Sequence, residues 1–325
     1  MSGMRWWLAG AALAGCGGDP ATEVDLGDGP SDGDTDTDTD ADSDADADSD
    51  ADTDTDADAD ADSDTDADTA GSTSDTAPDG RDYSTDRDLF FGDSRCGGAG
   101  LVLCDGFEDG AIDFGRWAAH PWAPLPTIDA TQAARGSASL HFHTDQNGFA
   151  ALVQSSVFPM PGDAYWGRLF VRFDALPTAP SWAHWTIVGA TGPDVPGEIR
   201  VGGQFDPYFG ANRWGVGSDG GATGDWMFLD EDAGPAAAAD DTWSCIEWYH
   251  DAGADLTTFW WDAVEHPSLA TTAADHGGSG APYTLPAFDA LWIGWWLYQG
   301  SPDPDHYDVW IDEVAIDGER IGCVL

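Results

Sequence analysis

Lysine is absent from this chain of 325 residues, and arginine is scarce: eleven arginines stand against 61 acidic residues, for a formal net charge of −50. Without a lysine amine the protein cannot form a Schiff base or build a P-loop phosphate site. The shortage of positive charge excludes nucleic-acid binding, because phosphate contacts require a basic footprint. It also excludes attraction to an anionic bilayer, so any membrane attachment must come from a lipid.

Long apolar runs are also absent, and the first sixteen residues contain only a short one. Residues 6–15 follow a positive charge at Arg5 and are too few to span a bilayer, which is typical of a secretory signal. The run ends Leu13-Ala14-Gly15-Cys16, which resembles the lipobox of bacterial lipoproteins. The resemblance implies a signal peptide over residues 1–16 and lipidation of Cys16. The alternative is an ordinary signal peptide with an incidental cysteine.

By the same resemblance, the residue after the cysteine bears on localisation. Gly17 is not the aspartate that retains lipoproteins at the inner membrane. We therefore expect an exported protein that is lipid-anchored to the cell envelope, at the outer membrane, and exposed at the surface.

Residues 17–88 form an acidic low-complexity region. From Asp32 to Asp68 every even-numbered residue is aspartate, and no apolar periodicity remains that burial could use to offset chain entropy. Like charges two residues apart extend the chain, so this region predicts a disordered tether that reaches on the order of 200 Å. A calcium-binding polyanion is the alternative, but the run lacks the glycine spacing of an EF-hand loop.

Five cysteines are present, and four remain once Cys16 is set aside for the lipid. An even number in an exported chain predicts two disulfides, with three possible connectivities. We favour Cys96–Cys104 as a local clip and Cys245–Cys323 as a link to the C-terminal segment. No CxxC pair or neighbouring histidine indicates zinc instead.

Residues 89–325 contain recurring strand signals separated by glycine, proline and aspartate. No long segment has a 3.6-residue apolar period, and Ala236–Asp241 is the one plausible helical turn. The pattern predicts an all-β sandwich or barrel. The expected strands are Leu101–Phe107, Ser137–His143, Phe149–Phe158, Tyr165–Asp174, Ala183–Ala190, Glu198–Phe205, Trp243–Asp251, Leu256–Asp262, Phe288–Tyr298 and Tyr307–Ile316.

Three of these segments resemble concanavalin A-like jelly rolls. Residues 103–110 with Trp117 look like the opening strand of that family, residues 307–316 like its closing strand, and residues 243–262 like its central hairpin. The resemblance implies that residues 89–325 form a jelly-roll β-sandwich. We expect the protein to be a monomer.

The same resemblance implies a structural calcium ion, with Glu108 and Asp312 as ligands and a backbone carbonyl near Gly136. The alternative is two solvated carboxylates. Laminarinase-type members carry Glu-x-Asp-x-x-Glu, which this chain lacks; Asp230-Glu231-Asp232 comes nearest and has the wrong spacing. We therefore do not expect glycosidase activity, which needs two suitably placed carboxyl groups.

Strand alternation places several polar side chains on shared faces. Arg168 and Arg172 share one side of the strand at 165–174, and Arg200 and Gln204 share one side of the strand at 198–205. These arginines indicate either a site for an acidic ligand or ion pairs with nearby carboxylates on an exposed sheet face.

Aromatic residues are the second surface signal. Trp292, Trp296 and Tyr298 alternate onto one face of the strand at 288–298. Flat rings beside polar groups suit sugar rings, so the face predicts carbohydrate binding. The alternative is a strand buried on both faces.

We therefore expect a surface-displayed carbohydrate-binding, lectin-like domain whose partner is a polysaccharide or surface glycan. The first alternative is a polysaccharide lyase acting on uronates, in which His184, Arg200, Gln204 and Tyr208 would neutralise the carboxylate and remove the C5 proton. The alginate-lyase pattern Gln-x-His is absent, since Gln204-Phe205-Asp206 stands in its place. A third hypothesis is an adhesion domain that recognises protein.

Overall fold

The structure, a computed structural model, describes residues 80–219, 226–228, 237–276 and 283–325. The predicted signal peptide, residues 17–79 of the predicted tether and the triplet Asp230-Glu231-Asp232 lie outside these ranges. Within the described ranges, no helix combines the length and apolar character needed to cross a bilayer.

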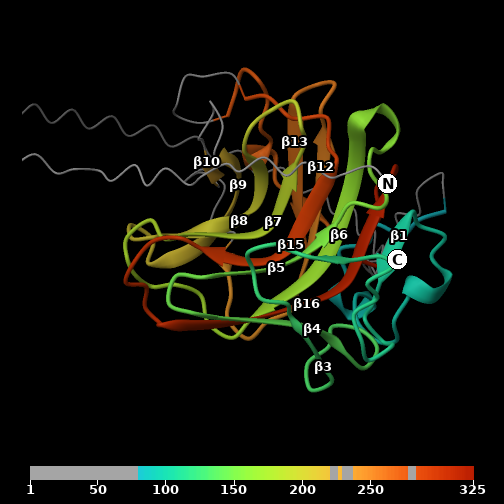
Figure 1. Cartoon of the computed structure of the whole chain (residues 1–325), viewed down its shortest axis with the longest axis horizontal. Helices are drawn as coiled ribbons and strands as arrows, with labels where there is room; N and C mark the ends of the chain where they lie inside the picture. Colours follow the sequence, from blue (N-terminus) through green and yellow to red (C-terminus); the bar gives the residue numbers. More distant parts are fainter. Residues whose placement is uncertain (1–79, 220–225, 229–236, 277–282) are drawn as a thin grey trace, which may run out of the picture. The chain divides into compact units, whose positions relative to one another are not determined.

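Two antiparallel β-sheets face each other, as Figure 1 shows. The prediction of an all-β sandwich is confirmed. In order across the first sheet lie β14 (Val264–Glu265), β13 (Leu256–Trp261), β12 (Ser244–Asp251), β6 (Ala164–Phe173), β16 (His306–Asp317), β4 (Ser139–Asp145) and β3 (Thr127–Asp129), with β1 (Leu103–Asp105) paired to the C-terminal part of β16. In order across the second lie β10 (Trp226–Phe228), β9 (Ala211–Asp219), β8 (Glu198–Asp206), β7 (His184–Thr191), β15 (Ala290–Leu297), β5 (Phe149–Gln154) and β2 (Ala118–Ala119), with β11 (Ala237–Ala238) paired to β9.

The hydrophobic core fills the space between the sheets. Each central strand sends alternate apolar residues inward, as the period of two requires. Trp185, Trp214 and Trp295 meet in its centre, with Trp185 edge-on to Trp214 at 5.2 Å between ring centroids. Such aromatic contacts stabilise a core by roughly 0.5–1.5 kcal/mol beyond their buried area. Many of the tryptophans are therefore structural.

All ten expected strands are present, with ends that shift by a few residues. The sequence prediction missed β9, whose glycines at 215 and 217 resemble a loop although Trp214 and Val216 alternate into the core. The helical turn expected at Ala236–Asp241 is wrong. Residues 237–238 instead form β11, because pairing with β9 satisfies their backbone groups.

The chain segments near both ends of the described region cover much of the outer face of the first sheet. Arg81 donates to the carbonyl of Glu319 at 3.0 Å, and the hydroxyl of Tyr83 donates to the carbonyl of Arg320 at 3.1 Å. Phe90 packs with Phe170 of β6 in a small second core. In Figure 1 the blue-green segment accordingly lies beside the red C-terminal end.

Both predicted disulfides are confirmed. Cys96 and Cys104 lie 5.0 Å apart between Cα atoms, and Cys245 and Cys323 lie 6.0 Å apart. The second disulfide ties β12 to the C-terminal segment. Two disulfides indicate an extracytoplasmic protein, because thiols stay reduced in the cytosol.

Candidate functional site

The arginines that the sequence analysis singled out do not form one cluster. Arg168 is fully buried on the covered face of the first sheet, 3.4 Å from the carboxylate of Glu313. Arg172 pairs with Asp241 at 2.6 Å. Arg200 lies on the other sheet and pairs with Glu198 at 3.1 Å. All three arginines pair with carboxylates, as the ion-pair alternative predicted, but Arg168 and Arg200 are buried and do not lie on an exposed face. Arg168 is covered by the terminal segments and is inaccessible to a glycan.

The outer face of the second sheet gathers the remaining predicted site residues. Strand register places His184 of β7 opposite Gln204 of β8, and Gln204 opposite Arg213 of β9. On the neighbouring strand β15, Trp296 is opposite Thr186 of β7. Residues directly opposite on one face are side-chain neighbours, so these polar and aromatic groups form one surface. We call it the second-sheet face.

Gln204 and Trp292 each carry a buried side-chain nitrogen on this face that has no hydrogen-bond partner among the described residues. The side chain of Gln204 is 1% exposed. A buried donor without a partner costs about 1–3 kcal/mol, so nearly all such groups in native proteins are paired with protein or water. The amide is enclosed within the face, so an acceptor oxygen of a ligand would reach it only after neighbouring side chains move.

His184 is held in one tautomer by Gln299. The backbone N–H of His184 donates to the amide oxygen of Gln299 at 2.9 Å, and the amide nitrogen of Gln299 donates to the carbonyl of Trp182 at 3.2 Å. These two backbone groups fix which end of the amide is nitrogen. That nitrogen lies 2.8 Å from Nδ1 of His184, which must therefore accept. The neutral ring then carries its proton on Nε2, where it is a donor and not a base.

The aromatic residues differ in accessibility. Tyr298 is 46% exposed and stacks parallel to His184, with ring centroids 5.9 Å apart. Trp296 is half-buried beneath the guanidinium of Arg200, whose Cζ lies 4.0 Å from the ring centroid. Trp292 is 3% exposed and lies across Gly189, where a Cβ atom would come within 2.2 Å of its indole nitrogen. Trp292 is therefore a packing residue of this face and does not offer its ring to a ligand.

Sequence reasoning missed several groups on this face. Arg213 comes from the unpredicted strand β9 and pairs with Asp206 at 3.1 Å, both buried. Phe149 of β5 packs edge-on against Trp292 at 5.0 Å. The alternation of residues 211–219 is the signal that would have placed Arg213 beside Gln204.

Tyr208, predicted for a lyase, lies apart from the enclosed row. It follows β8, is largely exposed, and packs edge-on against Trp182 at 5.6 Å. Trp182 is also the residue whose carbonyl holds Gln299, so Tyr208 occupies the rim near His184.

The predicted calcium ligands lie at the two ends of one loop, residues 134–138. The carboxylate of Glu108 accepts from the backbone and hydroxyl of Ser137 at 3.0 and 2.7 Å, and that of Asp312 accepts from the backbone of Ala134 at 2.9 Å. Burial raises the pKa of Asp312 to about 7. At Gly136, φ is +67° and a Cβ would lie 2.2 Å from the Glu108 carboxylate. Both carboxylates accept backbone N–H groups of this loop, Glu108 from Ser137 and Ala138 and Asp312 from Ala134 and Arg135, so a calcium ion held by the pair stays a prediction.

A different group of potential metal ligands in the described part of the chain consists of Cys96, Cys104 and Glu313. The two cysteines are joined in a disulfide and are not thiolates, so this group does not fit a metal.

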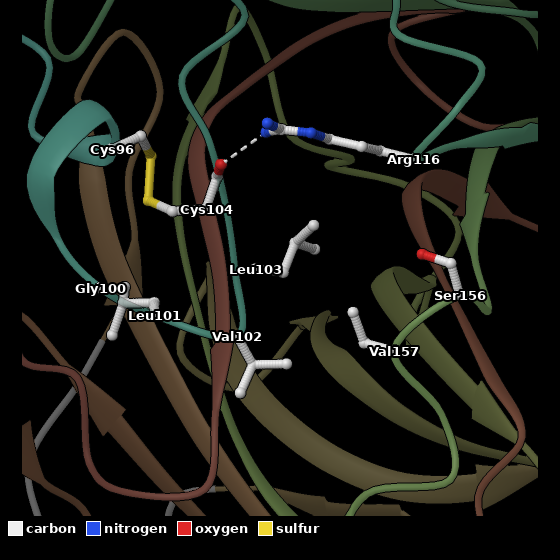
Figure 2. Close-up of a pocket in the computed structure, with 9 residues that line it drawn as sticks. All are labelled: Cys96, Gly100, Leu101, Val102, Leu103, Cys104, Arg116, Ser156 and Val157. Atoms are coloured by element: carbon white, nitrogen blue, oxygen red, sulfur yellow. Dashed lines mark hydrogen bonds between the residues drawn. A yellow bond between two sulfur atoms is a disulfide. The ribbon is translucent and has the colours of Figure 1, made fainter.

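A small pocket lies away from the second-sheet face, beside the first disulfide. Figure 2 shows Arg116 reaching the carbonyl of Cys104 across it, at 3.0 Å. The cavity is about 310 Å³. Its one cationic side chain, Arg116, is engaged with that carbonyl. It is lined by Cys96, Gly100, Leu101, Val102, Leu103, Cys104, Arg116, Ser156 and Val157.

No protein-family model matches this sequence, and no curated protein matches it. Among solved structures, the cellulose induced protein Cip1 is similar with a TM-score of 0.49 and 19% identity, over 68% of this chain and 99% of that protein. A β-1,3-glucanase from Mycobacterium marinum follows with a TM-score of 0.43 and 16% identity, over 67% and 99%. The binding domain of botulinum neurotoxin serotype G has a TM-score of 0.39 and 11% identity, over 69% and 49%. At these identities the similarity concerns the fold alone.

Proposed function

We propose that the second-sheet face binds a glycan, with Gln204 as its central hydrogen-bond donor. The observation that carries this proposal is the buried amide nitrogen of Gln204, which has no partner among the described residues. A sugar hydroxyl or carboxylate oxygen is an acceptor that would satisfy it.

The neighbouring groups supply the rest of a sugar site. His184 lies in the row next to Gln204, on the adjacent strand. Tyr298, which lies 6.1 Å from Trp296 between ring centroids, offers an aromatic face to the C–H face of a sugar ring, whereas the guanidinium of Arg200 lies over Trp296. A few fixed polar groups beside apolar rings are the usual composition of a small-molecule site.

The substitution Gln204→Met tests this proposal, because a binding role and a structural role predict opposite effects. The shape is nearly kept while the unpaired donor is removed, so thermal stability should stay equal or rise, and binding on a glycan array should weaken at least about tenfold. Gln154→Met is the matched control. That amide bonds the carbonyl of Arg116 at 2.7 Å and the hydroxyl of Ser156 at 2.9 Å, so its loss should lower stability.

Absence of glycan binding by the unmodified protein, with calcium or with EDTA, would overturn the proposal and favour the adhesion hypothesis. A Gln204→Met protein that is less stable yet binds normally would assign Gln204 a structural role.

A uronate-specific lyase is the second candidate, and the row of Arg213, Gln204 and His184 is the observation that favours it. Gln204 would neutralise the uronate carboxylate. The tautomer of His184 weighs against that residue as the base, because its outward nitrogen carries the proton; Tyr208 or Tyr298 would then have to act. Incubation with acidic polysaccharides tests the candidate through the absorbance of unsaturated uronates, and no absorbance across the panel would exclude it.

We also propose that Cys16 carries a lipid and that the chain from residue 17 onward tethers the domain to the envelope. The predicted tether, residues 17–88, is too long at its end, because Arg81 and Tyr83 already bond the C-terminal segment of the domain. The lipobox pattern and the two disulfides support an exported, anchored protein. Replacing Cys16 with serine should abolish incorporation of a fatty-acid label and release the protein from the membrane fraction. Unchanged labelling would contradict the anchor.

A further inference from the structure

Trp122 is an exposed tryptophan in the loop between β2 and β3. Its side chain is 66% exposed. A single exposed ring is common on protein surfaces, so the significance of Trp122 depends on which residues surround it. Sequence reasoning did not select Trp122, because it lies outside every expected strand.

The loop that carries Trp122 is held in place. Pro121, Pro124 and Pro126 fix the backbone dihedral φ at three of its positions. Ala123 packs onto the small apolar cluster on the second-sheet face that contains Trp292. The preceding strand β2 is paired with β5. The ring of Trp122 is thus presented from a restrained loop beside the proposed glycan site.

A continuous series of ring contacts joins Trp122 to that site. Trp122 packs edge-on against His120 at 5.6 Å, and His120 packs edge-on against Phe149 at 4.7 Å. Phe149 contacts Trp296 at 5.2 Å. Burial lowers the pKa of His120, so its ring is uncharged at neutral pH and suits this apolar series. Trp296 leads on to Tyr298, which stacks on His184.

We propose that Trp122 is an outer subsite for a glycan chain, and that the second-sheet face binds an extended chain and not a single sugar or a chain end. This inference rests on the proposed function. It is argued from continuity: the exposed rings at the two ends, Trp122 and Tyr298, are linked by aromatic contacts without a break. A chain of sugar rings can lie along such a series, because each ring offers an apolar face to an aromatic side chain.

The test is the dependence of affinity on chain length. Binding to cello-, laminari-, mannuronate and glucuronate oligosaccharides, from disaccharide to hexasaccharide, is measured by calorimetry. For a glycan that binds, Trp122→Ala should weaken the hexasaccharide about tenfold and leave the disaccharide unchanged, whereas Trp296→Ala should weaken every length. Trp122→Phe should retain most of the affinity, since a flat ring remains.

Phe114→Ala is the matched control, because Phe114 is similarly exposed and, within the described residues, makes no contact with another aromatic ring. Equal affinity of Trp122→Ala and the unmodified protein for all lengths would overturn the inference, as would an equal loss at all lengths. If the unmodified protein binds none of the oligosaccharides and no glycan on the array, the proposed function itself fails. If only a protein partner is lost in Trp122→Ala, the loop is a protein contact and the inference is wrong.

Discussion

Gly294, in the bulged stretch of β15, shows how a single residue is constrained by its neighbours. Its φ is +154°, and a Cβ atom there would lie 2.0 Å from the carbonyl oxygen of Ala150. No rotamer relieves a contact with backbone. Gly294→Ala should therefore lower the free energy of unfolding by about 1–3 kcal/mol, measured by denaturant titration.

Gly318→Ala is the control for this substitution, because nothing lies within 4 Å of its added Cβ. We expect it to be close to neutral. Equal stability of the two variants would contradict the packing argument.

His250 should make the protein sensitive to mild acid. It is fully buried, and burial lowers its pKa from 6.5 to about 3. Below pH 6.5 the His250 imidazole is protonated in the unfolded chain but stays neutral in the folded protein. The free energy of unfolding therefore decreases as pH falls from 6.5 toward 3. The loss reaches about 1.4 kcal/mol per pH unit. His250→Phe should flatten the fall of Tm between pH 7 and pH 5.

His250→Phe should disturb few other hydrogen bonds. The hydroxyl of Thr257 loses His250 but keeps Tyr283 at 3.2 Å, so stability at pH 7.5 should change little. The exposed His306→Gln is the control and should leave the slope unaltered or slightly changed. Parallel pH profiles for His250→Phe and the unmodified protein would disprove this role for His250.

At the scale of elements, the two disulfides should contribute unequally. Cys245–Cys323 closes a sequence separation of 78 residues and Cys96–Cys104 one of 8. In the loop-entropy model these contribute about 4 and about 2 kcal/mol. Replacing both cysteines of the longer loop with alanine should lower Tm more than the same change in the shorter loop, as calorimetry would show. The reverse order would mean that local packing outweighs loop entropy.

The calcium prediction concerns the loop of residues 134–138, which is bonded by Glu108 at one end and by Asp312 of β16 at the other. Added calcium should raise Tm and EDTA should lower it, because Glu108 and Asp312 would gain a counter-charge. Glu108→Gln should remove this response, whereas Asp109→Asn, its exposed neighbour, should keep it. An unchanged Tm in EDTA would end the calcium hypothesis.

At the scale of the whole molecule, Arg135 joins three distant parts of the chain. It donates to the carbonyls of Phe90 and Leu325, at 2.5 and 2.7 Å, and pairs with Glu313 at 3.2 Å. Burial is the main cause that lowers its pKa to about 9, so it is still cationic at neutral pH. Arg135→Met leaves buried acceptors unpaired, and we expect a loss of about 3–5 kcal/mol in denaturant titrations.

Arg172→Met, on strand β6, is the matched change at a less buried arginine. Arg172 pairs with the exposed Asp241 and stacks on Trp310, so its loss should cost about 1 kcal/mol. Comparable losses for the two arginines would contradict the assignment of Arg135 as the central link.

Much of the fold could be predicted from the chain alone, because local patterns encode it. Alternating apolar residues predicted the ten strands, and the cysteine count limited the disulfides to three connectivities. The strand β9 was missed because its glycines have no side chain, so the alternation of apolar and polar residues that marks a strand is interrupted there. Arg213 was missed with it.

The candidate site was predicted only in part. Alternation correctly placed His184, Gln204 and Trp296 on single faces of their own strands, but it contains no information about which strands are neighbours. Arg168 and Arg200 therefore looked alike in sequence, although one lies under the terminal segments and the other on the second-sheet face. Trp122 and His120 belong to a loop, where no periodicity marks a face.

The sequence by itself determined the charge, the β-sandwich class and the disulfide-bonded, exported character, because each follows from composition or from the period of two along a strand. Only the tertiary structure decided which side chains meet. Strand order brought His184, Gln204 and Arg213 into one row, the bonds of Gln299 chose the tautomer of His184, and packing left the amide of Gln204 buried and Trp122 exposed. These outcomes depend on contacts between residues far apart in the chain, which no local pattern specifies.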